Sequence, residues 1–308
     1  MASVKDGPDG IRENVQLKNF TTYKIGGPAK YFIEAKTKED IMQTVLWAKK
    51  INLPFFILGS GSNLLVSDNG FEGLVIKIQN SKYEIPRTRT SSVRGRQNTK
   101  IFANAGAPLA LIVNTAAEAG LAGLEWAAGI PGTIGGAIYG GVGMPDLGQS
   151  MKAVVENVEA LDANNLMIKN FSNKECDFAY RESIFKKHKN LIILSATIKL
   201  KKENSEKIKK KIKEFILIRQ AKQPLDLPSA GSVFKNPQGF YAGDLIEKCG
   251  LKETKIGSAQ ISRKHANFIL NLGGATAEDI KSLIELAKKE VKNKFGIELN
   301  EEIQYLGF

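Results

Sequence analysis

The segment "KQPLDLPSAGSVFKNP", residues 222–237, puts the hydroxyl of Ser232 where a short strand is expected to begin. The proline and glycine before Ser232 disfavour a long helix or a central strand, the two apolar residues after it favour an extended chain, and Asn236-Pro237 ends it. No obvious histidine partner accompanies this serine, and a nucleophilic serine needs a base. We therefore expect a proton donor or a ligand contact, with a turn serine that satisfies backbone groups as the alternative.

Further sequence blocks, in a fixed order, extend this pattern over nearly the whole chain. With the Ser232 segment (residues 222–237) they are "LKNFTTYKIGGPAKYF" at 17–32, "ILGSGSNLLVSDNGFEGLVIKI" at 57–78, "GLEWAAGIPGTIGGAIYGG" at 123–141, "YRESIF" at 180–185, "KIGSAQISRKHANFILNLGGATAEDI" at 255–280 and "ELNEEIQYLG" at 298–307. In these blocks the chain resembles the UDP-N-acetylenolpyruvoylglucosamine reductases, flavoenzymes of early peptidoglycan synthesis. Its length and compact C-terminal part resemble the shorter, second type of that family.

Composition indicates a soluble globular protein of two or three domains, because the 308 residues are 43% hydrophobic and 25% charged. No stretch approaches the roughly 20 apolar residues of a membrane span, and the N-terminal residues lack the apolar run of a signal peptide. A cytoplasmic protein without membrane insertion is expected. Cys176 and Cys249 lie far apart, and His188 and His265 are the only histidines, so neither a disulfide framework nor a metal site is expected.

The formal net charge of +12 indicates an affinity for anions. Much of the excess lies in the basic stretch at 87–100 and in a predicted helix face at 199–215. No recognition helix, zinc-finger spacing or aromatic RNA-binding motif accompanies these runs, so nucleic-acid binding is not expected. For the basic stretch we favour a surface loop that steers anionic substrates over a set of direct pyrophosphate contacts.

Strand and helix signals alternate along the chain, which predicts an α+β fold. Helices are expected after the capping box of Thr37 and Asp40, at 108–119, 203–221 and 242–248, and from the capping box of Thr276 and Asp279 to residue 294. Strands are expected at 30–35, 54–59, 73–78, 100–105, 153–160, 165–171, 191–200 and 302–306, with an extended stretch at 258–270.

The resemblance implies a two-subdomain FAD-binding fold of the vanillyl-alcohol-oxidase/PCMH type, followed by a C-terminal α+β domain that binds the substrate. The subdomains are expected at 16–82 and 83–202, and the substrate domain at 203–308. The helix at 203–221 is the natural bridge into the last domain, which has a common domain size.

Two glycine-rich segments are candidates for phosphate binding, and neither has the dinucleotide or P-loop motif. Their glycines permit close backbone approach, and their hydroxyl and amide groups can hold phosphate oxygens. A pair of tight turns is the alternative. The resemblance implies contacts with FAD by Gly59, Ser60, Gly61, Ser62, Asn63, Gly129, Pro131, Gly132, Thr133 and Gly136.

The resemblance also implies the residues of catalysis. Ser232 matches the proton donor, and Arg181 and Glu302 match the residues that stabilise the charge formed during hydride addition. Taken alone, Arg181 and Glu302 read as surface charges. Substrate contacts are implied for Lys222, Asn236 and Tyr180; Lys222 can also assist Ser232, whose hydroxyl is a very weak acid by itself. Lys235 and His265 are weaker candidates, and His265 is expected to be structural.

The chain departs from the family pattern at two places. Where the family has an asparagine after "GGA" and an apolar pair, this chain has Gly141, so an amide that could contact flavin or substrate is missing. We expect Tyr139, Gly143 or a backbone group to compensate. The family's Glu-Pro-Glu-Val-Arg is replaced by residues 300–304, "NEEIQ", which keep Glu302 and end in Gln304.

The expected function is reduction of UDP-N-acetylglucosamine enolpyruvate to UDP-N-acetylmuramate by a monomeric enzyme with bound FAD and NADPH as co-substrate. Two alternatives stay open from the sequence. One is an FAD-dependent oxidase of the same fold, which would lack the pairing of Ser232 with Glu302. The other is a non-catalytic protein that binds nucleotide sugars or nucleic acid.

Overall fold

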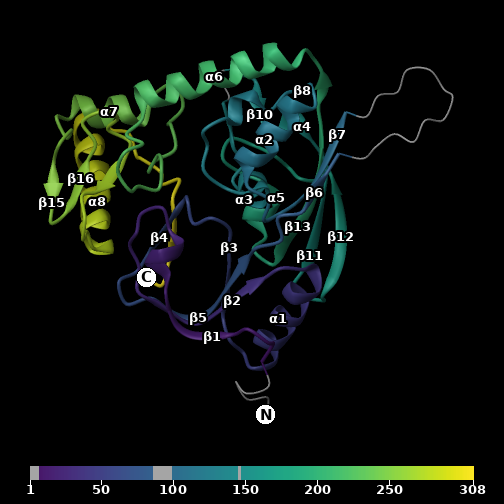
Figure 1. Cartoon of the computed structure of the whole chain (residues 1–308). Coiled ribbons are helices and arrows are strands. Elements are labelled where there is room, and N and C mark those ends of the chain that lie inside the picture. Colours follow the sequence, from purple (N-terminus) through teal and green to yellow (C-terminus); the bar gives the residue numbers. More distant parts are fainter. Residues whose placement is uncertain (1–6, 86–98, 145–146) are drawn as a thin grey trace. The chain divides into compact units, whose positions relative to one another are not determined.

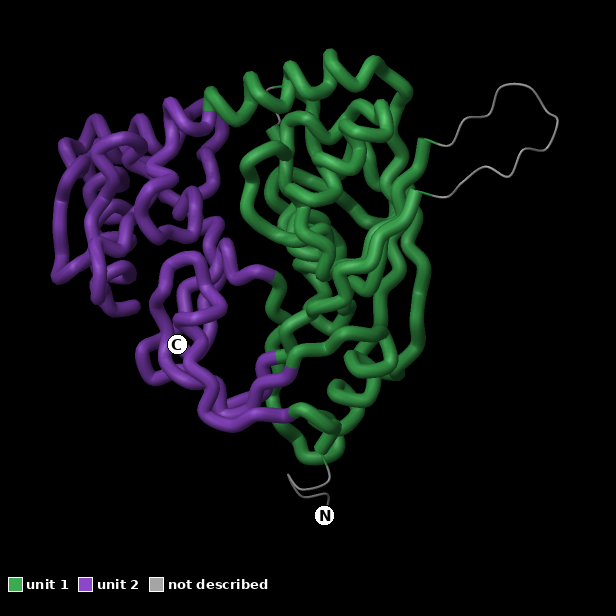
Figure 2. Tube along the Cα trace, in the orientation of Figure 1, with its two compact units in different colours: residues 1–10, 34–59, 76–218 green, residues 11–33, 60–75, 219–308 purple. Residues whose placement is uncertain are grey.

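The computed structural model describes residues 7–85, 99–144 and 147–308, which form two compact units (Figure 2). Each unit is assembled from segments that are distant in the sequence. Unit 1 comprises residues 1–10, 34–59 and 76–218; unit 2 comprises residues 11–33, 60–75 and 219–308. The predicted boundaries of the FAD-binding subdomains, at 82/83 and 202/203, stay a prediction.

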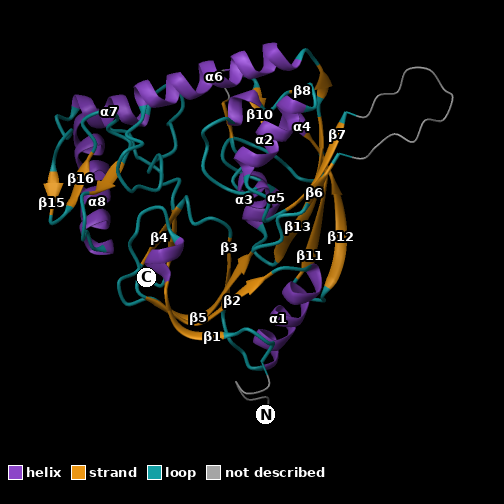
Figure 3. Ribbon diagram, in the orientation of Figure 1, coloured by secondary structure: helices purple, strands orange, loops and turns teal. Residues whose placement is uncertain are grey.

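Unit 1 contains an antiparallel five-stranded sheet of order β12-β11-β13-β7-β6. Its strands are β12 (Met167–Ser172), β11 (Val155–Asp162), β13 (Leu191–Lys199), β7 (Lys100–Asn104) and β6 (Tyr83–Glu84). The short helices α3 (Ile134–Tyr139) and α5 (Ile184–Lys187) pack against β13 (Figure 3). The strands predicted at 100–105, 153–160, 165–171 and 191–200 are confirmed within a few residues.

A second sheet has the order β1-β2-β5-β3, and the division between the units falls within β2 and β5. Its strands are β1 (Arg12–Gln16), β2 (Pro28–Ala35), β5 (Phe71–Ile78) and β3 (Phe55–Leu58). Helix α1 (Lys38–Lys50) follows β2 through the predicted capping box, in which Thr37 Oγ1 accepts the Asp40 N–H and the Asp40 carboxylate accepts the Thr37 N–H.

Unit 1 also contains β8 (Leu121–Ala122), β9 (Gly143–Met144), β10 (Gln149–Ser150), β14 (Lys201–Lys202), α2 (Leu109–Glu118), α4 (Met151–Val154) and the 3-10 helix η3 (Glu125–Ala127). Helix α2 begins after Pro108 and ends before Gly120, whose φ of 64° suits glycine. Helix α6 (Ser205–Lys222) runs from unit 1 into unit 2 (Figure 1).

Unit 2 combines a three-stranded antiparallel sheet, β15 (Lys255–Ile256), β16 (Ala259–Ile261) and β17 (Ile269–Asn271), with helices α7 (Ala242–Lys248) and α8 (Ala277–Phe295). Helix α8 packs on β15 and β16 through one apolar face and begins at the predicted Thr276–Asp279 capping box. A parallel pair, β18 (Gln304–Leu306) with β4 (Leu64–Val66), joins the chain terminus to the loop that follows β3.

Two extended segments of the prediction are wrong in part. Residues 258–270 form the strands β16 and β17 separated by a turn, in which Ser262 Oγ accepts the N–H groups of Lys264 and His265. The Ser232 segment is not a strand, because its extended pairing is a single bridge between Phe234 and Glu301. The last strand begins at Gln304, two residues later than predicted.

Among the described residues, no helix has the length and apolar character needed to cross a membrane. The same residues hold no group of three or more histidine, cysteine or acidic side chains placed to bind a metal ion.

Candidate active site

In unit 2 a buried asparagine holds the backbone on the C-terminal side of Ser232. Asn267 is 3% exposed, and its side chain accepts the Phe234 N–H at 2.9 Å and donates to the Phe234 carbonyl at 2.8 Å. Its own carbonyl accepts the Val233 N–H at 2.8 Å. Asn267 thus replaces the partner strand that the sequence predicts for this segment. Sequence reasoning missed it, although an amide between apolar residues in "HANFIL" is a signal for such a buried anchor.

The segment that carries Glu302 is hydrogen-bonded to the Ser232 segment. The Glu302 N–H donates to the Val233 carbonyl at 2.7 Å, and on its other side the Asn63 side-chain amide donates to the Glu302 carbonyl at 3.0 Å. Three predicted site residues, Ser232, Glu302 and Asn63, are therefore brought to one backbone junction. Ser232 and Glu302 are both half-buried, so their side chains remain accessible to a ligand.

The carboxylate of Glu301 takes part in a different set of contacts. It accepts a hydrogen bond from Lys288 at 2.9 Å, and this bond is the main cause that raises the pKa of Lys288. Burial, followed by hydrogen bonding to Glu301, raises the pKa of Tyr305. The sequence predicts that the side chains of Glu301 and Glu302, as neighbours in an extended segment, point in opposite directions.

Further predicted site residues of unit 2 are Lys222, Lys235, Asn236 and His265. Lys222 is the exposed last residue of α6. Asn236 Oδ1 accepts the N–H of Ala242, the first residue of α7, at 3.1 Å, and Lys235 N–H donates to the Asn300 carbonyl at 2.8 Å. His265 Nδ1 accepts the Asn267 N–H at 3.2 Å, and burial lowers its pKa, in line with a structural role.

In unit 1 Tyr180 and Arg181 form the tip of a tight turn. Ala179 and Glu182 close it with reciprocal backbone hydrogen bonds of 3.1 and 3.2 Å. Arg181 has a φ of 56°, the left-handed conformation that costs a residue with a Cβ about 1–2 kcal/mol. A non-glycine residue held in this region is a signal of functional constraint. We name residues 179–182 the Arg181 turn.

Backbone groups of the segment 139–143 hold the Arg181 turn. Arg181 Nη1 donates to the Gly143 carbonyl at 3.0 Å, and Ser183 Oγ donates to the Tyr139 carbonyl at 2.8 Å. The guanidinium also lies 5.3 Å from the centre of the exposed Tyr180 ring, within cation–π range. The carbonyls on either side of position 141 thus bind the Arg181 turn, and the compensation expected for the missing family asparagine stays a prediction.

Gly141 itself explains this departure from the family pattern. Its φ is 54°, and a Cβ placed on it would lie 2.6 Å from the Glu182 carbonyl oxygen and 3.1 Å from that of Ala179. The backbone of the Arg181 turn therefore occupies the space that any larger residue at 141 needs.

The second glycine-rich segment lies against the beginning of the first one within unit 1. A Cβ on Gly59 would come 3.0 Å from Thr133 Oγ1. Because glycine has no Cβ, no side chain at position 59 covers that hydroxyl. Thr133 also caps α3 by accepting the Gly136 N–H at 3.2 Å. Positive φ values of 76° and 147° at Gly129 and Gly132 shape the preceding loop. Gly129, Pro131 and Gly136 are exposed.

The rest of the first glycine-rich loop, residues 60–63, belongs to unit 2. Gly61 has a φ of 65°, and a Cβ on it would lie 2.1 Å from the Phe20 carbonyl oxygen, so only glycine fits there. The hydroxyl groups of Ser60 and Ser62 lie 3.4 Å apart at the surface. Exposed hydroxyls beside a backbone that glycine brings close are the features that a pyrophosphate requires. The loop at residues 60–63 therefore has the chemical groups of a phosphate site, and its contact with FAD stays a prediction.

The predicted site residues are divided between the two units. Unit 1 carries Gly59, Gly129, Pro131, Gly132, Thr133, Gly136, Tyr180 and Arg181. Unit 2 carries Ser60, Gly61, Ser62, Asn63, Lys222, Ser232, Asn236 and Glu302. The basic arginines Arg87, Arg89, Arg94 and Arg96 lie outside the described residues.

Comparisons with known proteins identify two parts of this chain. Residues 29–169 match the profile of an FAD binding domain, and residues 223–306 match that of the UDP-N-acetylenolpyruvoylglucosamine reductase C-terminal domain. The reductase of that name from Caldanaerobacter subterraneus subsp. tengcongensis is 46% identical, with 96% of this chain and 93% of the relative covered. The one from Clostridium novyi is 40% identical, with coverages of 96% and 92%.

A solved structure is similar to this chain in fold. The crystal structure of UDP-N-acetylenolpyruvylglucosamine reductase from Thermus caldophilus matches with a TM-score of 0.76 at 34% identity, and covers 96% of this chain and 99% of that chain. The expected α+β class, an FAD-binding fold followed by a C-terminal domain, is confirmed. The chain belongs to the UDP-N-acetylenolpyruvoylglucosamine reductase family.

Proposed function

We propose that this protein reduces the enolpyruvyl group of UDP-N-acetylenolpyruvoylglucosamine to give UDP-N-acetylmuramate, with NADPH as the source of hydride. The names of relatives that cover almost the whole chain support this reaction. The observation that carries the proposal is the junction in unit 2, where the Glu302 N–H donates to the Val233 carbonyl at 2.7 Å, next to Ser232. A proton donor and a charge-stabilising acid, remote in the sequence, are thereby neighbours.

FAD would be held by the glycine-rich segments, with its phosphates at Ser60, Ser62 and the approach to Thr133 that Gly59 leaves open. When bound, the flavin supplies the hydride that is added to the terminal carbon of the enolpyruvyl group, after receiving one from NADPH. An FAD binding domain over residues 29–169 supports this cofactor.

The chain's own residues supply the proton and the charge stabilisation. Hydride addition to the terminal carbon leaves negative charge on the α-carbon and on its carboxylate, which Arg181 and Glu302 stabilise in this proposal. Ser232 then gives its hydroxyl proton to the α-carbon, and the new C–H bond completes the lactyl ether.

The remaining substrate groups are assigned by charge and exposure. Lys222, exposed at the end of α6, and Tyr180, exposed beside Arg181, are each assigned to the substrate in this proposal, and so is Asn236, which lies where the Ser232 segment leads into α7. An anionic sugar nucleotide also suits the net charge of +12.

The cellular setting is part of the same proposal. The product is a precursor of peptidoglycan, so the protein would act in cell-wall synthesis, and through it in cell shape and division. The cytoplasm as the place of the reaction and a monomer as the active form belong to the same proposal.

The Ser232→Ala variant tests the proposal through its two half-reactions. Stopped-flow absorbance separates reduction of the flavin by NADPH from its reoxidation by the enolpyruvyl substrate. Loss of a positioned general acid costs about 10²- to 10⁴-fold, so we expect slow reoxidation with unchanged reduction. Ser229→Ala, in the same segment, is the matched control and should leave both rates unchanged. Reoxidation by substrate at the wild-type rate in Ser232→Ala would refute the role of Ser232.

A further inference from the structure

Asn63 lies at the point where the glycine-rich loop meets the strand pair that leads to Glu302. The loop ends at this residue, and β4 begins at the next one, Leu64, which pairs with Gln304. Asn63 uses both its backbone and its side chain there: its carbonyl accepts the Gln304 N–H at 3.0 Å, and its side-chain amide donates to the Glu302 carbonyl at 3.0 Å. The side chain therefore continues the ladder of hydrogen bonds beyond the end of β18.

This contact decides how firmly the Glu302 peptide is held. Its N–H has one partner, the Val233 carbonyl, on the side of the Ser232 segment, and its carbonyl has the Asn63 amide on the opposite side. Without the amide, the Glu302 carbonyl loses this donor, while the bond of the Glu302 N–H to the Val233 carbonyl remains. The carboxylate would then sample a wider range of positions, although every residue that touches the reacting atoms is still present.

The loop on the other side of Asn63 is itself fixed in place. Gly61 lies so close to the Phe20 backbone that a Cβ would come within 2.1 Å of its carbonyl oxygen, and the Gly61 carbonyl accepts the Thr22 N–H at 3.2 Å. The fixed loop therefore holds Asn63 in place, and Asn63 in turn holds the Glu302 backbone through its hydrogen bond. A polar residue on a rigid support can act in this way without touching the substrate.

We propose that Asn63 is a positioning residue for Glu302, which couples the cofactor loop to the residue that stabilises charge on the substrate. This inference rests on the proposed function, because it takes Glu302 as a participant in the substrate half-reaction. It replaces the family-based expectation that Asn63 contacts FAD, because the side-chain amide is used on the Glu302 carbonyl.

The test is a double-mutant cycle of Asn63→Ala with Glu302→Ala, read in rates per bound flavin. Misplacement of a catalytic group by about 1 Å costs up to about 10²-fold, so Asn63→Ala should slow reoxidation by substrate by about 10- to 100-fold. Reduction by NADPH and the flavin dissociation constant, from a spectral titration, should change by less than about threefold, since a factor of three is below 1 kcal/mol. The double variant should be no slower than Glu302→Ala, because the two residues act as one unit.

Asn271→Ala is the matched control in the same unit. Its side-chain amide donates to the Tyr23 carbonyl at 2.9 Å, so the variant also loses an amide–carbonyl bond, but away from the junction. It should lower the melting temperature without slowing reoxidation. If Asn63→Ala fails to fold, Asn63→Asp keeps the shape and removes the donor, and it should show the same selective slowing.

The outcomes separate this inference from the proposed function. Multiplicative effects in the double variant, equal slowing of both half-reactions, or a wild-type rate in Asn63→Ala and Asn63→Asp would overturn the coupling alone. A wild-type rate of reoxidation in Glu302→Ala would overturn both the coupling and the assignment of Glu302.

Discussion

The Arg181 turn and the Ser232 segment are held by opposite means. Arg181 sits in the left-handed region with a φ of 56°, in a turn packed directly on the backbone at Gly141. The Ser232 segment has one extended bridge and backbone hydrogen bonds to Asn267, Asn300 and Glu302, and the buried side-chain amide of Asn267 adds two more. The Arg181 turn is positioned by the lack of a side chain at Gly141, and the Ser232 segment by the side chain of Asn267.

This difference determines which changes each region tolerates. Adding a methyl group beneath the Arg181 turn displaces backbone atoms, whereas removing a polar group beside the Ser232 segment leaves buried donors and acceptors unpaired. We therefore expect the first region to lose activity with moderate loss of stability, and the second to lose stability first.

Asn267→Ala should give the largest loss of stability. It removes the partners of the Phe234 N–H and carbonyl, both beside a buried ring. Each buried unsatisfied group costs about 1–3 kcal/mol, so the free energy of unfolding should fall by about 2–5 kcal/mol. Chemical denaturation measures it. Asn173→Ala, which also removes an amide bound to carbonyls but near the surface, should cost less. Equal losses of unfolding free energy in Asn267→Ala and Asn173→Ala would show that Asn267 stabilises the fold no more than an asparagine near the surface.

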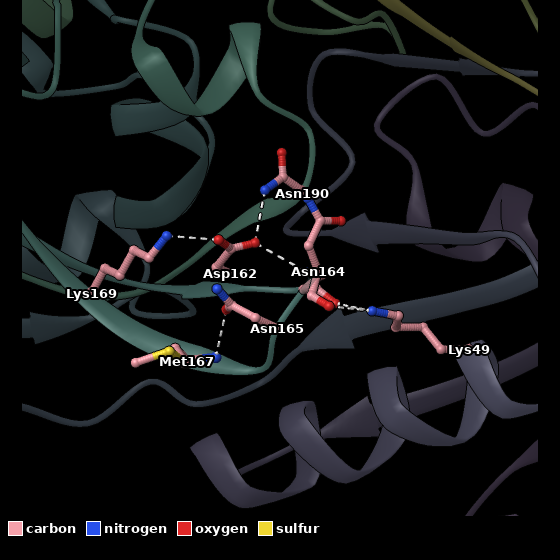
Figure 4. Close-up of polar contacts among 8 residues, drawn as sticks. Lys49, Asp162, Asn164, Asn165, Met167, Lys169 and Asn190 are labelled. Carbon is pink, nitrogen blue, oxygen red and sulfur yellow. Dashed lines mark hydrogen bonds and ion pairs between the residues drawn. The ribbon is translucent and has the colours of Figure 1, made fainter.

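A third polar centre lies on the β11–β12 hairpin of unit 1 (Figure 4). Asp162 accepts hydrogen bonds from Lys169 at 2.8 Å, from Asn190 at 2.8 Å and from the Asn164 N–H at 3.0 Å. Lys49 of α1 donates to the Asn164 carbonyl beside it. These bonds, Lys169 first, lower the pKa of Asp162 to about 2.

Asp162→Asn should cost about 1–3 kcal/mol at neutral pH, the value of hydrogen bonds to a charged group. An unfolded aspartate has a pKa of about 3.9. Since the folded pKa is lower, the stabilisation is complete above the unfolded value and is lost as the pH falls toward the folded pKa of about 2. The free energies of unfolding of variant and wild type should therefore converge as the pH falls from about 5 to about 1, through the folded pKa. A gap of undiminished size near pH 1 would exclude the ionised carboxylate as its source, and the exposed Asp177→Asn should show little gap at any pH.

Gly141→Ala should act on rate more than on stability. The added Cβ would press on the Glu182 carbonyl at 2.6 Å and shift the Arg181 turn. A displacement of a few tenths of an ångström should slow reoxidation by substrate by about tenfold, given that 1 Å costs up to about 10²-fold. Gly148→Ala is the control, because Gly148 has a similar φ of 62° and nothing within 4 Å of its Cβ position. Equal rates of reoxidation in Gly141→Ala and Gly148→Ala would show that the contact between residue 141 and the Arg181 turn does not affect the reaction.

The smallest effect is expected at the basic stretch. Neutralising Arg87, Arg89, Arg94 and Arg96 should lower the second-order rate of substrate capture at low salt and leave saturated turnover nearly unchanged, because steering is screened over about 8 Å at physiological salt. Rates measured across ionic strength decide this. A loss of saturated turnover, or of FAD, would place these arginines in the site and move the predicted boundary at 82.

Local signals made much of the fold predictable. The capping boxes at Thr37 and Thr276 and the proline start of α2 each depend on residues a few positions apart, and all three are confirmed. The Ser232 segment was predicted as a strand because its residues favour extension, but its partners, Asn267 and Glu301, are set by tertiary packing. The last strand starts late for the same reason, since the Glu302 N–H bonds to Val233 instead of β4.

Residue types alone left the candidate site open, because turns and surface charges explain the same serines, glycines and charged groups. The resemblance supplied the proposed roles, and the residues that support the site were not predicted. That Asn63 bonds to Glu302 and that Gly141 lies under the Arg181 turn are contacts between distant segments. Neither leaves a periodicity or a local motif.

The most direct test of the account is to mix the NADPH-reduced protein with UDP-N-acetylenolpyruvoylglucosamine in the absence of oxygen. We predict that the oxidised flavin spectrum returns and that UDP-N-acetylmuramate forms in an amount equal to the flavin. A protein that stays reduced until oxygen is admitted, and then forms hydrogen peroxide without this product, would contradict the account and identify an oxidase.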